Sequence, residues 1–208
     1  YVSICDHSQT AVYAGGLKPE RVFEQHREID ALNAELAPFK IYKGIESDIL
    51  SDGSLDYTND VLASFDMVVA SIHSNLKMDE AKATARLLKA IENPYTTILG
   101  HPTGRLLLAR EGYPIDHKRI IDACATNGVV IELNAHPYRL DLDWRWIHYA
   151  QERGVFISIN PDAHSVNGLD MQFGLSAARK GGLLKSRCFN AFSLEEMNAY
   201  LQNKKSKI

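Results

Sequence analysis

Short apolar runs rich in β-branched residues alternate with longer segments of helical periodicity along the whole chain. The short runs are nearly continuous in apolar residues, which is typical of parallel strands that are buried on both faces. The pattern predicts six strands, at residues 1–4, 40–45, 67–72, 96–100, 129–134 and 156–160.

Helices are predicted between these strands, at residues 19–37, 78–92, 116–127, 143–153 and 193–202. Their ends carry the expected signals. Pro19 suits a first helical turn, Gly128 suits a left-handed C-terminal cap, and Ser193 with Glu196 forms a capping-box pattern. Alternation of strands and helices predicts an α/β fold with right-handed crossovers, and no linker or composition break divides the chain. We therefore expect one domain over residues 1–208.

Potential metal ligands follow each predicted strand within a few residues. The polar residues at these positions are Asp6, His7, Glu46, Asp48, His73, His101, Asn134, His136, Asp162 and His164. The steps from His7 to Glu46, His73 and His101 are 39, 27 and 28 residues, and 61 residues then lead to Asp162. These intervals match one βα unit each, or two for the last, so the side chains should recur at the carboxyl ends of parallel strands. In a βα barrel that end carries the active site.

Histidine and carboxylate together suit Zn²⁺, Mn²⁺ or Fe. Structural roles are the alternative for each residue taken singly. Glu46 could pair with Lys43, His73 could belong to the start of a helix, and Asp162 with His164 could form a loop turn. A shared metal centre explains all the positions together.

Composition limits the possible partners. The 208 residues include 45% hydrophobic and 24% charged residues, with 23 Lys plus Arg against 26 Asp plus Glu, a formal net charge of −3. Binding of nucleic acid through bulk positive charge is thereby disfavoured, so any contact with DNA needs a local basic surface. The candidates for phosphate or DNA binding are Arg105, Arg139 and Lys180, with Arg179 beside the last.

The chain lacks any window of 18 consecutive apolar residues, so we expect no membrane span. The three cysteines are widely spaced and form no CxxC motif, which favours a reducing, cytoplasmic compartment.

Several segments together resemble the PHP (polymerase and histidinol phosphatase) domain. They are CDHS at 5–8, GIESDIL at 44–50, SIHS at 71–74, GHPTGR at 100–105, ELNAHPYRLDL at 132–142 and NPDAHS at 160–165. The similarity continues through LDMQFGLSAARKGGL at 169–183 and covers essentially the whole chain. Within the superfamily the chain looks most like the C-terminal PHP domain of bacterial family-X DNA polymerases.

The resemblance implies a distorted TIM-like barrel of seven βα units with a centre of up to three divalent metal ions (Zn, Mn or Fe). Its metal-binding and catalytic residues would be His7, Glu46, His73, His101, Asp162 and His164, with Glu46 as the bridging carboxylate. The family's opening motif, His-x-His followed by Ser-Asp-Gly, does not occur in this chain, because Ser51, Asp52 and Gly53 have no His-x-His partner and lie in the wrong place. We therefore expect the first βα unit to be missing, and the chain to be the C-terminal part of a longer polymerase-type protein.

The function implied by the resemblance is that of a metal-dependent phosphoesterase. The reaction would be 3′–5′ exonucleolytic or 3′-phosphatase cleavage at single-stranded or gapped DNA ends during repair, alongside a preceding polymerase domain. One alternative is a small phosphate monoesterase similar to histidinol phosphatase. A second is a non-catalytic PHP module that supports a polymerase.

Overall fold

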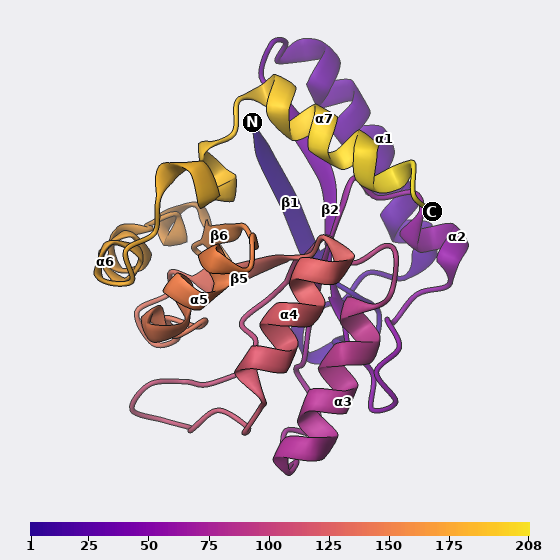
Figure 1. Cartoon of the computed structure of the whole chain (residues 1–208). Helices are drawn as coiled ribbons and strands as arrows, with labels where there is room; N and C mark the ends of the chain where they lie inside the picture. The colour runs from indigo at the N-terminus through magenta and orange to yellow at the C-terminus, as the bar shows by residue number, and fades with distance from the viewer.

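A single parallel sheet organises the protein in the computed structural model, which describes all residues from Tyr1 to Ile208. Its six strands follow one another in sequence order and curve into a half-barrel (Figure 1). They are β1 (Val2–His7), β2 (Ile41–Asp48), β3 (Met67–Ser71), β4 (Ile98–Leu99), β5 (Val130–Asn134) and β6 (Ile157–Asn160). The α/β fold of a distorted TIM-like barrel is confirmed.

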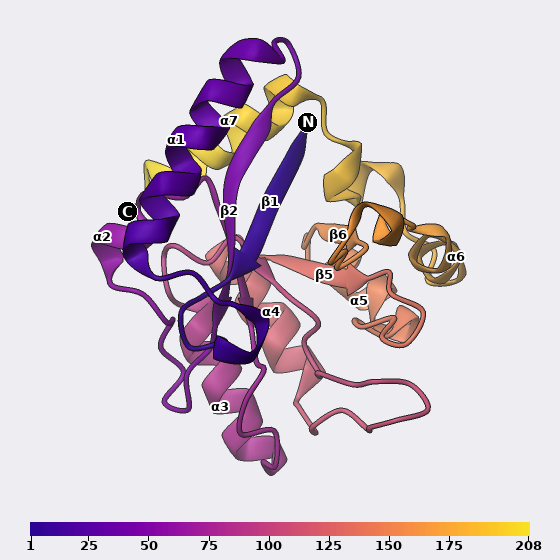
Figure 2. The same cartoon turned by 180° about the vertical axis from the view of Figure 1, so that it is seen from behind.

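Seven α-helices surround the sheet: α1 (Pro19–Glu35), α2 (Asn59–Leu62), α3 (Glu80–Ile91), α4 (His117–Asn127), α5 (Ile147–Glu152), α6 (Gln172–Lys180) and α7 (Leu194–Lys205). Helix α1 packs on β2, α3 and α4 pack on each other, and α6 packs on β5 and β6. The last helix, α7, crosses the same end of the molecule as α1, so both termini lie there (Figures 1 and 2).

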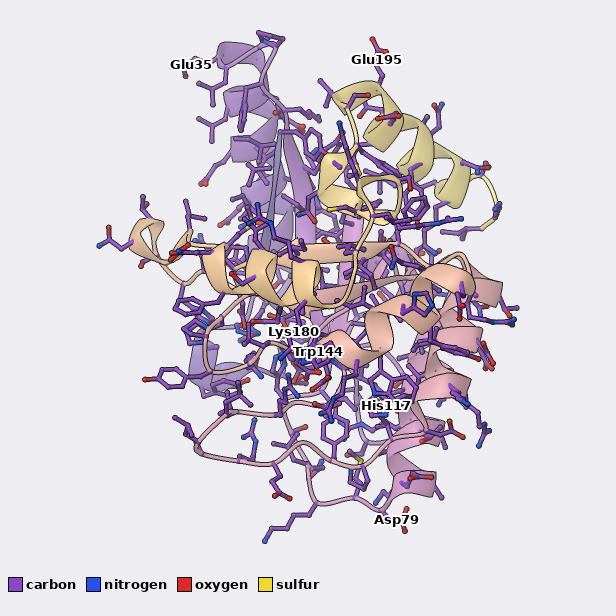
Figure 3. The ribbon with its side chains drawn as sticks, turned by 60° about the vertical axis from the view of Figure 1, so that its left-hand side comes forward. Glu35, Asp79, His117, Trp144, Lys180 and Glu195 are labelled. Carbon is purple, nitrogen blue, oxygen red and sulfur yellow. The ribbon has the colours of Figure 1, made fainter.

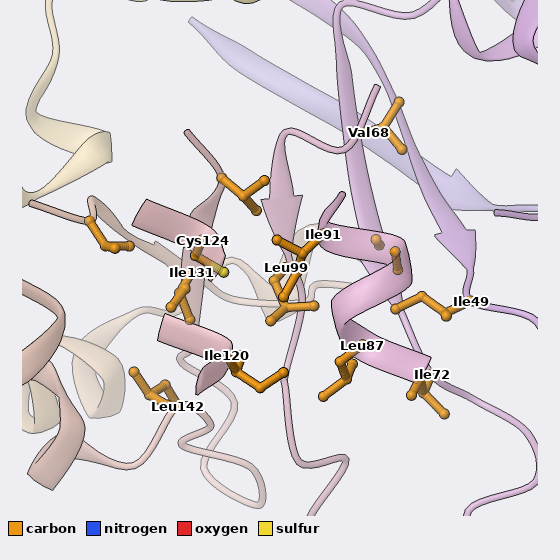
Figure 4. Close-up of a cluster of buried hydrophobic side chains, with 14 of the residues drawn as sticks. Ile49, Val68, Ile72, Leu87, Ile91, Leu99, Ile120, Cys124, Ile131 and Leu142 are labelled. Atoms are coloured by element: carbon orange, nitrogen blue, oxygen red, sulfur yellow. The ribbon is translucent and has the colours of Figure 1, made fainter. Parts of the chain in front are cut away.

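The apolar side chains form two clusters on opposite sides of the sheet. The larger cluster lies between the strands and the outer helices, where Leu87 of α3 and Ile120 of α4 meet Leu99 and Ile131 of the sheet (Figure 4). The smaller cluster lies on the inner side of the sheet near the amino ends of the strands. Its members are Tyr42, Met67, Val69, Ile98, Val130, Phe189, Met197 and Leu201. Two of them come from α7, which therefore closes that end of the barrel.

All six predicted strands are present, although the fourth has only two residues and the first continues three residues beyond its predicted end. The second also continues three residues beyond its predicted end. Its extension, Glu46 to Asp48, is polar yet buried. Burial is tolerated because neighbouring groups form hydrogen bonds with its polar atoms. The backbone N–H of Asp48, for example, donates to Ser8 Oγ at 2.9 Å. The apolar run in the sequence ends earlier than the strand, so hydrophobicity alone could not locate this end.

The five predicted helical segments are present, one of them in altered form, and the structure adds two further helices. The segment predicted as one helix at 143–153 is a 3₁₀ turn (Trp144–Trp146) followed by α5, with the Asp143 carboxylate accepting from the backbone N–H of Arg145 at the turn. Helices α2 and α6 lie outside the five predicted ranges, and the four residues of α2 are too few to show a period. No helix has the length and apolar character needed to cross a membrane.

The barrel is open between its two edge strands, β1 and β6, which do not pair with each other (Figure 2). A cavity of about 780 Å³ lies along this opening. At one end it is lined by His7, Glu46, Asp162 and His164, and deeper inside by apolar residues such as Met67. Four of the six predicted ligands therefore line this cavity, at the carboxyl ends of the strands.

Candidate metal centre

The carboxylate of Glu46 lies at the centre of the predicted site, in contact with three histidines. Its Oε1 is 3.0 Å from Nε2 of His101 and 3.2 Å from Nε2 of His73. Its Oε2 is 3.5 Å from Nδ1 of His7, which stands opposite it in the register of β1 and β2. Three imidazoles from three chain segments thus converge on one carboxylate.

Asp48 extends this cluster on the side of His73. Its Oδ1 lies 2.6 Å from Nδ1 of His73, while its Oδ2 accepts from Thr10 Oγ1 at 3.2 Å. The imidazole of His73 is therefore held between two carboxylates. A carboxylate on the far nitrogen of a histidine fixes its tautomer and orientation, which is the usual support of a metal-ligating histidine.

The two predicted ligands after β6 reach the same region. The rings of His164 and His7 are 5.9 Å apart between centroids. The Nδ1 of His164 lies 2.9 Å from the carbonyl oxygen of Asp162, and its side chain is 71% exposed. Asp162 Oδ2 accepts from Asn134 Nδ2 at 3.0 Å and pairs with Arg139 Nε at 3.3 Å. All six predicted ligands therefore lie at one end of the barrel.

Burial and hydrogen bonding have opposite effects on the pKa values at the centre of the cluster. Burial alone would raise the pKa of Glu46, but hydrogen bonds from His101 and His73 hold that pKa well below its ordinary value. Burial alone would lower the pKa of His73, yet its hydrogen bonds to Asp48 and Glu46 prevail and raise it to about 9. The pKa of His101 is raised against the effect of burial, mainly through Glu46. The raised pKa values of His73 and His101 favour the protonated form of both rings beside Glu46 in the metal-free chain.

The donor set fits a divalent metal. Nδ1 of His7 and Nδ1 of His101 are buried and make no hydrogen bond. Two groups of possible ligands have their donor atoms within 4.8 Å of one another, His7 with Asp48 and His73, and Glu46 with His73 and His101. Nitrogen and carboxylate donors at this spacing suit Zn²⁺, Mn²⁺ or Fe.

The predicted phosphate-binding residues have different environments. Arg139 lies at the edge of the cluster, paired with Asp162. Arg105 is fully engaged elsewhere, because it donates to the carbonyls of Arg139 and Leu140 and pairs with Asp143 Oδ2 at 2.9 Å. Its contacts hold the segment that carries Arg139 in place. A phosphate-binding role remains a prediction for both.

Lys180 lies at the end of α6, where its Nζ is 4.4 Å from the centroid of the Trp144 ring (Figure 3). This cation–π contact gives the ammonium group a partner of its own. The structure records no contact between Lys180 and the predicted metal ligands, so its role in binding DNA remains a prediction.

Asp48 and Glu132 are site residues whose roles the sequence did not reveal. Asp48 appeared only as one of several acids after a strand, and nothing in the spacing shows that it contacts His73. Glu132 occupies the middle of an apolar strand, is 5% exposed and lines the cavity. Burial raises its pKa to about 7. An acid inside an otherwise apolar strand was the available signal.

Comparison with known proteins decides the family. The chain is 47% identical over 203 residues to the DNA polymerase/3′-5′ exonuclease PolX of Bacillus subtilis, an alignment that covers 97% of this chain and 36% of that protein. The chain is a PHP-like domain of the family-X polymerase type. The resemblance read from the motifs is thereby confirmed. No family model matches the chain.

Other relatives of this PHP-like domain are named as phosphatases. A probable phosphatase of Thermoanaerobacter is 28% identical over 191 residues, which are 86% of this chain and 75% of that protein. A probable phosphatase of Caldanaerobacter subterraneus is 31% identical over 135 residues, 60% of this chain and 51% of that protein. Both groups of relatives support a phosphoesterase. The chain spans about a third of the length of the PolX relative.

Proposed function

We propose that this PHP-like domain is a metal-dependent phosphoesterase that cleaves DNA from its 3′ end, as a 3′–5′ exonuclease or a 3′-phosphatase. The observation that carries the proposal is the contact of Glu46 with His7, His73 and His101. A carboxylate has two oxygens, so one that lies among three imidazoles could bind more than one ion. Histidine ligands also limit the negative charge that an incoming phosphate meets.

The proposed ligands are His7, Glu46, His73, His101, Asp162 and His164, and they would hold up to three divalent ions. When bound, such ions activate water and neutralise charge on the phosphoryl oxygens. Other side chains of the protein would orient the ligands and bind the substrate. Asp48, which contacts Nδ1 of His73, would orient that ring, and the guanidinium of Arg139, which pairs with Asp162, would bind phosphate oxygens.

A polymer substrate is favoured by the residues around the site. Segments that follow β1, β4, β5 and β6 each expose a large apolar or aromatic side chain, namely Tyr13 at 73%, Leu108 at 101%, Tyr138 at 56% and Val166 at 83%. The ring of Tyr13 lies 6.2 Å from that of His7, between centroids. Exposed aromatic rings beside a phosphoesterase centre suit unpaired bases, which stack on them regardless of sequence. A small monoester would leave these side chains uncovered.

The relatives named as phosphatases favour the second candidate, a small phosphate monoesterase similar to histidinol phosphatase. A non-catalytic module is disfavoured, because all six ligand positions retain residues that can bind metal. The DNA-cleaving enzyme and the small monoesterase differ in how much of the protein surface around the phosphate group their substrates would contact.

We further propose that the domain belongs to a longer polymerase-type protein and works on DNA ends in the bacterial cytoplasm during repair, next to a polymerase domain. The alignment to 36% of the PolX relative supports this. The unpaired edges of β1 and β6 support a missing first βα unit, which would lie along the cavity between them and add further ligands.

A nuclease assay tests the proposal. The longer polymerase-type protein that contains this domain is incubated with Mn²⁺ and one of three substrates. These are a 5′-labelled DNA single strand, the same strand ending in a 3′-phosphate, and histidinol phosphate. We expect stepwise shortening or 3′-phosphate removal at a rate far above that on histidinol phosphate. Glu46→Gln should abolish it, whereas Asp52→Asn, which alters an exposed acid paired with Lys89, should not. Faster turnover of histidinol phosphate would favour the second candidate, and no turnover of any substrate with Mn²⁺ bound would favour the non-catalytic module.

A further inference from the structure

A carboxylate without a cationic partner is buried beneath the metal cluster. Glu132 lies in the middle of β5 and is 5% exposed, and it forms no ion pair with any Lys, Arg or His. Burying a charged carboxylate costs several kcal/mol unless its oxygens are well satisfied. Packing alone therefore does not explain a glutamate at this buried position.

The oxygens of Glu132 accept hydrogen bonds from the ends of three strands. Oε2 accepts from the backbone N–H of His101 at 2.8 Å and from Asn134 Nδ2 at 3.3 Å. Oε1 accepts from Asn160 Nδ2 at 2.9 Å. The three donors stand just after β4, at the end of β5 and at the end of β6. One side chain therefore joins the carboxyl ends of three neighbouring strands.

Two of these bonds lead to proposed metal ligands. The first holds the backbone of His101 itself. The second holds Asn134, whose Nδ2 also donates to Asp162 Oδ2 at 3.0 Å. Both ligands have positive φ, 21° at His101 and 53° at Asp162. Residues other than glycine adopt such backbone angles at a cost and keep them only where the surroundings impose them.

We propose that Glu132 is a positioning residue that fixes His101 directly, and Asp162 through Asn134, in the geometry required by the metal ions. The inference rests on the proposed metal centre. The groups behind metal ligands commonly change metal affinity by about 10–100-fold when they are altered. Glu132 would act on ligands from both sides of β5 at once.

A carboxylate is the group that this position requires. All three contacts are donors, and a carboxyl group offers an oxygen acceptor at both of its positions, whereas an amide offers an oxygen at only one. Glutamine would turn an NH₂ group toward an N–H donor and leave a buried group without its partner. Aspartate keeps the charge but is one methylene shorter, so it withdraws both oxygens from the three donors.

The test is the affinity of the chain for Mn²⁺, measured from the loss of the electron paramagnetic resonance signal of free Mn²⁺. We expect Glu132→Gln and Glu132→Asp each to weaken binding by at least about tenfold. Glu92→Gln, at the exposed end of α3, is the matched control and should leave the affinity unchanged. Loss of affinity in Glu132→Gln but not in Glu132→Asp would overturn positioning in favour of a simple effect of charge.

A second variant guards against misfolding. Asn134→Leu keeps Glu132 bonded to His101 but cuts the link to Asp162, and it should also weaken Mn²⁺ binding with the folded circular dichroism spectrum retained. Unchanged affinity in Glu132→Gln, while Glu46→Gln abolishes binding, would overturn the role of Glu132 and leave the metal centre standing. Unchanged affinity in Glu46→Gln as well would overturn the proposed centre itself.

Discussion

Glu46 Oε1 lies 3.0 Å from Nε2 of His101, although the two residues are 55 positions apart in the sequence. One is in β2 and the other follows β4, so the contact crosses β3 inside the curved sheet. The curvature of the half-barrel is what turns side chains of non-adjacent strands toward each other. A flat sheet with the same strand order would keep them apart.

The metal centre should stabilise the fold. A divalent ion at a concentration about a hundredfold above its Kd adds about 2.7 kcal/mol to the free energy of unfolding. Adding Mn²⁺ should therefore raise the melting temperature, and excess chelator should reverse the rise. In Glu46→Gln the melting temperature should no longer respond to Mn²⁺. An equal response in that variant would place the stabilising ion elsewhere.

Metal binding should release protons. Because hydrogen bonds to Asp48 and Glu46 outweigh burial and raise the pKa of His73 to about 9, the metal-free chain holds a proton there at neutral pH. An ion must displace it, so affinity should increase with pH and level off near pH 9. Calorimetry in two buffers of different ionisation enthalpy counts the protons.

The expected count is at least about one proton released per ion near pH 7. His148→Gln, in an exposed position on α5, should leave that count unchanged. The same pKa shift predicts that, without metal, the stabilisation from protonated His73 is fully present below the unfolded pKa of about 6.5 and is lost as pH rises through about 9. Metal binding without proton release would contradict the assignment of His73 as a ligand.

The exposed aromatic residues should distinguish DNA from small substrates. If Tyr13 and Tyr138 stack on bases, Tyr13→Ala and Tyr138→Ala should each raise the KM for single-stranded DNA by about 5–150-fold, since one stacked base contributes about 1–3 kcal/mol. Hydrolysis of a small chromogenic phosphate should be unaffected. Tyr95→Ala, just before the amino end of β4, serves as the control. Equal losses on both substrates would assign the two tyrosines to the phosphoryl centre.

A substitution in the apolar core should lower stability without changing metal affinity. Leu87 is 1% exposed between α3 and the sheet (Figure 4). Leu87→Ala should lower the free energy of unfolding by about 2–5 kcal/mol, because it removes buried methyl groups and leaves a cavity. Urea denaturation measures the loss. The Mn²⁺ affinity of the folded fraction should not change, and a parallel fall in affinity would show that the core and the centre are coupled.

Much of this arrangement could be predicted from the sequence, because periodicity and ligand spacing depend on the chain alone. Apolar runs located all six strands, and the intervals between His7, Glu46, His73 and His101 placed these residues at one end of the barrel. Contacts that depend on side-chain direction could not be predicted. The sequence gives no sign that Arg105 bonds to the carbonyl of Arg139 or that Glu132 reaches His101, since both contacts link segments about 30 residues apart.

The most direct measurement of the central claim is anomalous X-ray scattering from crystals of the chain soaked in Mn²⁺ and recorded near the manganese absorption edge. We predict an anomalous peak bounded by Glu46, His73 and His101, and its loss in crystals of Glu46→Gln. A peak elsewhere, or no peak at saturating Mn²⁺, would contradict the assignment of this cluster as the metal centre of a phosphoesterase.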